Sequence, residues 1–177
     1  LLQRCPMFLR LQPRRRFSDL TEAEILALAV SAEEEDARIY NSYAAFLHEE
    51  QPASADMFHE MAREEDRHRA RLIERFRARF GETLPLVKRE HVAGFPVRQP
   101  LRLNETTSLD TLRAEARLME QTAERFYRAA AKRTQDAQTR KLLGDLADAE
   151  AGHDRKAARL EETHLDAGNP QGRRTDT

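Results

Sequence analysis

Two short stretches of sequence decide the fold, MAREEDRHRARL at residues 61–72 and LADAEAGHDRKAARL at residues 146–160. Each contains one Glu-x-x-His element: Glu65 with His68, and Glu150 with His153. In a helix, side chains three positions apart share a face. Apolar residues flank both elements at helical spacing, so each pair is predicted to lie on an inward-facing stripe.

Two further helical stretches carry a single glutamate at a similar place. SAEEEDARIYNSYAAF contains Glu33 and Tyr40, and LMEQTAERFYRAAA contains Glu120 and Tyr127 at the same separation. The separation in sequence between Glu65 and Glu150 is nearly the same as that between Glu33 and Glu120. The chain therefore reads as two related helix pairs, and each pair is expected to supply half of one symmetric site.

The periodic segments and the breaks between them predict an all-α, ferritin-like four-helix bundle. The helices are expected at Ser18–Glu50, Ala53–Phe80, Ser108–Arg133 and Asp136–Leu165. The segment Gly81–Thr107, rich in proline and glycine, suits a long crossover between two antiparallel helix pairs. Residues 18–165 would form the domain, between a basic tail at 1–17 and a polar tail or linker at 166–177.

Composition excludes several other classes of protein. The chain has 177 residues, of which 34% are charged, yet its net charge is only -1, which gives no strong field for nucleic acid. Cys5 is the only cysteine, so neither an internal disulfide nor a thiolate metal cluster can form. The apolar run Ile25–Val30 is far shorter than the roughly 20 residues of a membrane span. By itself the chain is expected to be soluble.

The acidic residues at the middle of each stripe require a compensating positive charge. A buried carboxylate without a partner is strongly unfavourable, and no lysine or arginine occupies the stripes. Two divalent cations would neutralise four carboxylates, and two imidazoles would complete the ligand set. Iron or manganese suits such ligands, with zinc as a possible substitute. The predicted metal ligands, which would also carry any catalysis, are Glu33, Glu65, His68, Glu120, Glu150 and His153.

Other residues near the stripes have less specific interpretations. The hydroxyls of Tyr40 and Tyr127 are expected to donate hydrogen bonds to a ligand carboxylate on another helix. Glu34, Glu35 and Asp36 are interpreted as a solvated charged face. The alternative to a metal centre is a bundle with a water-filled polar layer.

The quoted stretches resemble the rubrerythrin branch of the ferritin-like superfamily from about Ser18 to Leu165. Within it, the chain is most similar to the erythrin domain of membrane-bound ferritin iron exporters. The resemblance implies a di-iron centre, bridged by Glu65 and Glu150, that binds and oxidises Fe(II) with oxygen or hydrogen peroxide. It also implies a place on the cytoplasmic face of a membrane, attached to a transporter domain that this sequence lacks.

Several alternatives stay open at this stage. The domain could be an iron sensor or an iron-delivery module without turnover, a rubrerythrin-like peroxide scavenger, or a structural bundle. Scavenging is disfavoured because complete rubrerythrins carry paired Cys-x-x-Cys ligands that one cysteine cannot supply. A homodimer is expected, and exchange of helix pairs between two chains is one way to form it.

Overall fold

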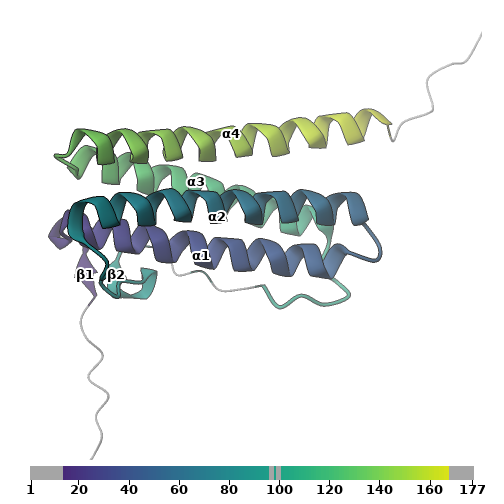
Figure 1. The fold of residues 1–177 in the computed structure, drawn as a ribbon. Coiled ribbons are helices and arrows are strands. Elements are labelled where there is room, and N and C mark those ends of the chain that lie inside the picture. The colour runs from purple at the N-terminus through teal and green to yellow at the C-terminus, as the bar shows by residue number, and fades with distance from the viewer. Residues whose placement is uncertain (1–13, 96–97, 99–100, 168–177) are drawn as a thin grey trace, which may run out of the picture.

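The computed structural model describes residues 14–95, 98 and 101–167, with side chains up to 152. Four long helices lie side by side in it (Figure 1). They are α1 (Glu22–Leu47), α2 (Pro52–Phe80), α3 (Leu109–Arg133) and α4 (Ala137–Ala167). Helix α1 packs mainly on α2, and α3 packs mainly on α4. The predicted bundle of two helix pairs is confirmed.

Capping explains where the helices begin and end. Thr21 Oγ1 accepts a hydrogen bond from the Glu24 amide at 3.2 Å, and the Glu24 carboxylate accepts one from the Thr21 amide at 2.9 Å. This capping box begins α1 later than predicted, because the preceding Phe17–Asp19 forms a separate 3₁₀ turn, η1. Helix α2 begins at a proline and is followed by Gly81, whose φ of 85° favours glycine.

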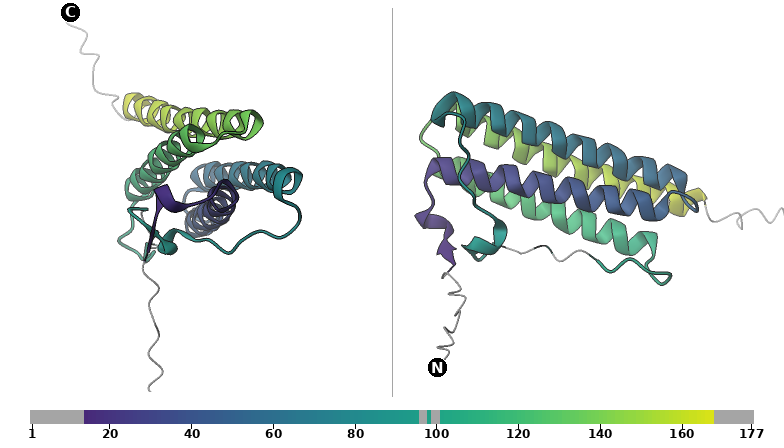
Figure 2. Two further views of the ribbon diagram at one scale, coloured as in Figure 1. Left: turned by 90° about the vertical axis from the view of Figure 1, so that its left-hand side faces the viewer. Right: turned by 60° about the horizontal axis from the view of Figure 1, so that its bottom comes forward.

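The segment between α2 and α3 must span the bundle. Helix α2 ends at one end of the bundle and α3 begins at the other (Figure 2). The segment contains a 3₁₀ turn, η2 (Arg89–His91), followed by a two-residue strand, β2 (Val92–Ala93). Strand β2 pairs in parallel with β1 (Arg15–Arg16), a part of the sequence expected in the basic tail. Arg15 is held there by an ion pair with Glu24.

The buried apolar residues form two separate clusters along the bundle. One gathers residues from the start of α1 and the end of α2, including Leu26, Leu72 and Phe76. The other gathers residues from the end of α1 and the start of α2, including Ala44 and Phe58. On α1, α2 and α3 the predicted acidic positions lie between these clusters, and on α4 Glu150 follows residues of the first cluster. The fold therefore places a polar layer inside the bundle, with apolar packing on both sides of it.

Candidate metal centre

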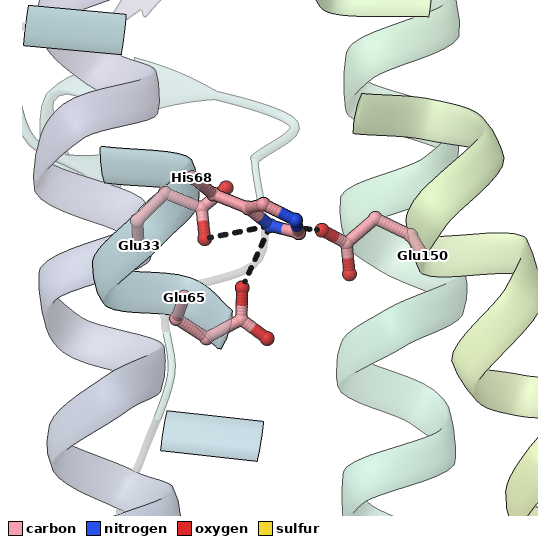
Figure 3. A group of neighbouring side chains, drawn as sticks. All are labelled: Glu33, Glu65, His68 and Glu150. Atoms are coloured by element: carbon pink, nitrogen blue, oxygen red, sulfur yellow. Dashed lines mark hydrogen bonds and ion pairs between the residues drawn. The ribbon is translucent and has the colours of Figure 1, made fainter. Parts of the chain in front are cut away.

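Four of the predicted ligands meet in this polar layer. Glu33 of α1, Glu65 and His68 of α2, and Glu150 of α4 each offer a ligand atom, and these atoms lie within 4.8 Å of one another. None of the four residues is more than 4% exposed. Figure 3 shows the three carboxylates around the His68 ring. Helical spacing accounts for this arrangement, because Glu65 and His68 share one face of α2.

The contacts of His68 show that the centre is short of positive charge. Its Nδ1 atom lies 3.2 Å from Glu65 Oε2, 3.2 Å from Glu150 Oε1 and 3.9 Å from Glu33 Oε2. A single ring nitrogen donates at most one proton, so it cannot satisfy three carboxylate oxygens. Glu150 Oε1 is within ion-pair distance of this nitrogen but accepts no hydrogen bond from the described residues.

Burial and mutual repulsion act on the same carboxyl groups. Burial, followed by the charge of Glu65, raises the pKa of Glu33 well above its ordinary value. Burial raises the pKa of Glu65 to about 8. Burial, then the charges of Glu65 and Glu120, raise the pKa of Glu150. Without a cation these groups therefore tend to hold protons at neutral pH, and a bound cation would displace those protons.

The two predicted tyrosine contacts are present and reciprocal. Tyr40 Oη on α1 donates to Glu120 Oε1 on α3 at 2.5 Å, while Tyr127 Oη on α3 donates to Glu33 Oε1 on α1. Burial, together with the charge of the carboxylate that each faces, raises the pKa of both tyrosines well above the ordinary value. Both hydroxyls therefore remain donors at neutral pH and orient the two carboxylates.

The other two predicted ligands differ in what can be said of them. Glu120 is 2% exposed, and its charge contributes to raising the pKa of Glu65 and of Glu150, so it belongs to the same layer. His153 lies in α4, one turn after Glu150. Its side chain lies outside the described residues.

An acidic residue next to the centre was assigned wrongly from the sequence. Asp36 was interpreted as part of a solvated face, but it is only 5% exposed. Arg89 donates to both its oxygens at 2.9 and 2.7 Å, and Arg98 donates to the same oxygens at 3.0 and 3.2 Å. We call these three residues the Asp36 clamp. Asp36 follows Glu33 by three positions and so shares its inward face, which was the signal in the sequence that could have identified it.

The Asp36 clamp joins the crossover to both helix pairs. Arg98 also donates to the carbonyl of Met119 at 3.1 Å, one residue before Glu120. The clamp thus fixes α1 near Glu33 and α3 near Glu120 at the level of the metal centre. Its two arginines are paired with carboxylates of α1, so they do not neutralise Glu65 or Glu150 by direct contact.

The residues present fit a divalent metal ion. Carboxylate oxygens and imidazole nitrogen are the ligands that iron and manganese accept. The charges of Glu33, Glu65 and Glu150 call for a cation, because the ion pairs seen for these three carboxylates among the described residues are with His68. A buried carboxylate–histidine centre between two helix pairs defines a ferritin-like protein with the capacity to bind metal.

Comparison with known proteins agrees with this class. A family model described as Rubrerythrin matches residues 24–161, and the chain therefore belongs to the rubrerythrin family. A hypothetical protein from Pyrococcus furiosus is similar at 26% identity and a TM-score of 0.69, over 85% of this chain and 94% of that one. An uncharacterized conserved protein from Magnetospirillum magnetotacticum MS-1 is similar at 25% identity and a TM-score of 0.62, over 88% and 100%. No curated protein matches the chain significantly.

Proposed function

We propose that the domain binds two iron ions and oxidises Fe(II) with dioxygen or hydrogen peroxide. The observation that carries this proposal is the convergence of Glu33, Glu65, His68 and Glu150, buried and short of positive charge. Glu120 and His153 complete the proposed ligand set and give each helix pair the same share of it. Four carboxylates then neutralise two divalent ions, with one imidazole for each ion.

The proposed reaction treats iron as a substrate. Two Fe(II) ions each lose one electron. Those two electrons, with two protons, reduce dioxygen to hydrogen peroxide, or hydrogen peroxide to two water molecules. Carboxylate ligands favour this direction because their negative charge stabilises Fe(III) more than Fe(II).

The protein contributes ligand geometry and exclusion of bulk water. Tyr40 and Tyr127 hold the carboxylates of Glu120 and Glu33, so these ligands are oriented before iron arrives. The apolar clusters on both sides of the layer keep the centre buried. Such a site strengthens the attraction between the carboxylates and a cation.

We further propose that this chemistry serves iron export and detoxification in a membrane-bound ferritin, with the domain on the cytoplasmic face as a homodimer. The support for this setting is the resemblance of the helix sequences to erythrin domains. Within the described part of the chain, no helix is sufficiently long and apolar to span a bilayer.

The proposal is tested by loading the protein with Fe(II) anaerobically and then adding dioxygen or peroxide. Absorbance of oxo-bridged ferric iron and consumption of the oxidant are followed together. We expect one two-electron oxidant consumed per two iron ions, repeatedly when Fe(II) is supplied again. Glu65→Ala should abolish this reaction, whereas Glu60→Ala, an exposed position on α2, should not. Tight binding of Fe(II) without oxidation would replace the proposal with an iron-sensing or delivery module.

A further inference from the structure

A small cavity adjoins the metal centre on the side where α1 faces α3. Glu33 and Tyr127 of the centre line it, together with Asp36, Arg89 and Thr122. Its volume is about 10 Å³, close to the room that one water molecule needs. We call it the inner cavity. A molecule of this size held in it would lie beside the proposed ligand Glu33.

A larger apolar hollow adjoins the inner cavity. It has a volume of about 380 Å³, and its walls include Phe17, Ala93 and Gly94. The hollow and the inner cavity share the side chains of Phe95, Thr122 and Phe126. These three side chains therefore form the partition between the hollow and the cavity. The rings of Phe95 and Phe126 meet edge to face, with centroids 5.0 Å apart.

Fixed positive charge makes this side of the centre unfavourable for a cation. Arg89 lines the inner cavity, is 5% exposed, and interacts electrostatically with Glu33. Arg125 lines the hollow outside it. The Arg89 guanidinium is paired with Asp36 and with Glu35 of α1, so the positive charge that the hollow itself presents is that of Arg125. An Fe(II) ion moving through the hollow would pass Arg125 and meet no acidic side chain among its described lining residues, whereas an uncharged molecule meets no such barrier.

One of the residues that line the inner cavity carries an unsatisfied hydrogen-bond donor. Among the described residues, Arg89 Nε is buried and has no hydrogen-bond partner. A buried donor without an acceptor is unfavourable, and an oxygen atom of a guest could satisfy it. Hydrogen peroxide has oxygen acceptors that suit this donor, whereas dioxygen is a poor hydrogen-bond acceptor and would be held by the small volume and the apolar lining residues of the cavity.

We propose that the α1–α3 side of the centre admits and holds the small uncharged oxidant, dioxygen or hydrogen peroxide, and excludes cations. The oxidant enters through the apolar hollow, passes the partition at Thr122, and occupies the inner cavity beside Glu33. This inference rests on the proposed oxidation of iron. It adds that oxidant and Fe(II) reach the centre from different sides.

The first test uses the metal-free protein and dissolved dioxygen, which is paramagnetic, as the probe. Ala32 lines the inner cavity, whereas Ala37 on the same helix does not, and both are 5% exposed. We expect dioxygen to enhance relaxation of the Ala32 methyl several-fold more than that of the Ala37 methyl. Thr122→Leu, which fills the partition, should remove this difference. Equal enhancement at both alanines in the unmodified protein would overturn the inference.

The second test follows oxidation of the iron-loaded protein by each oxidant separately. Thr122→Leu should slow oxidation several-fold without changing the anaerobic Fe(II) stoichiometry, and Ala123→Val offers a second filled variant. Ser42→Leu is the matched control, because Ser42, like Thr122, donates its hydroxyl to the carbonyl four residues earlier. Slower oxidation with dioxygen alone would show that dioxygen uses the route. Slower oxidation with both oxidants would show that hydrogen peroxide uses it as well. Unchanged rates with both would overturn it.

The two tests separate this inference from the proposed function. The relaxation measurement contains no iron, so its result does not depend on oxidation. Relaxation enhancement at Ala32 in a protein that binds Fe(II) but never oxidises it would overturn the oxidation proposal, while upholding the cavity as a site open to dioxygen.

Discussion

At the scale of single residues, the two lone glutamates and the two tyrosines form a crossed arrangement. Tyr40 follows Glu33 on α1 but bonds Glu120, and Tyr127 follows Glu120 on α3 but bonds Glu33. Each helix therefore orients the carboxylate of the other. This crossing couples the geometry of the two halves of the centre.

Removing one tyrosine hydroxyl is expected to weaken metal binding while the fold is retained. Tyr127→Phe keeps the ring but frees the Glu33 carboxylate, and loss of such a supporting contact typically costs about 10- to 100-fold in metal affinity. Competition with a coloured chelator measures the affinity. Tyr43→Phe is the control, since Tyr43 is buried against the rings of Tyr40 and Phe58. Equal losses in both variants would contradict the supporting role.

The raised carboxyl pKa values predict an unusual pH dependence for the metal-free protein. The pKa of Glu65 rises from 4.5 to about 8 on folding, so the folded state binds more protons than the unfolded state between these values. The free energy of unfolding should therefore fall as pH rises through this window. Urea unfolding of the metal-free protein measures it, and Glu65→Gln should reduce the slope. A free energy of unfolding that rises across the same window would contradict the prediction.

At the scale of elements, the Asp36 clamp links the crossover to α1 and α3. The two helix pairs make few contacts with each other, so this link has a large share in their relative placement. Asp36→Asn would leave the partly buried Arg98 without its carboxylate partner and the buried Arg89 with Glu35 alone, at an expected cost of about 3–5 kcal/mol in unfolding free energy. Glu34→Gln removes the exposed pair with Arg38 on the same helix and should cost less than about 1 kcal/mol. Similar costs for the two variants would show that the clamp is not structural.

Long elements were predictable from the sequence and short ones were not. The helices have a clear apolar period, Gly81 marks the end of α2, and buried glutamates interrupt otherwise apolar stripes, so the bundle and its polar layer could be read directly. Strand β2 has two residues and carries no period. The buried role of Asp36 depends on Arg89 and Arg98, which lie in the irregular crossover, and it was hidden within a run of four acidic residues.

At the scale of the whole molecule, the centre is a layer of charge between two apolar clusters. Metal binding should therefore stabilise the entire bundle, because the layer is common to all four helices. At a free metal concentration 100-fold above the dissociation constant, the expected gain is about 2.7 kcal/mol. Thermal unfolding with and without a chelator measures it. A melting temperature unaffected by metal would favour a water-filled polar layer instead.

The central claim is that this layer holds two iron ions, and the most direct measurement is an anaerobic Fe(II) titration with metal analysis of the purified protein. We predict two ions bound per chain in the unmodified protein and in the exposed-site variant Glu60→Ala. Binding should be lost in Glu65→Ala and in Glu150→Ala, because each removes a carboxylate from the buried group. Equal iron content in all four proteins, or none in the unmodified one, would contradict the account.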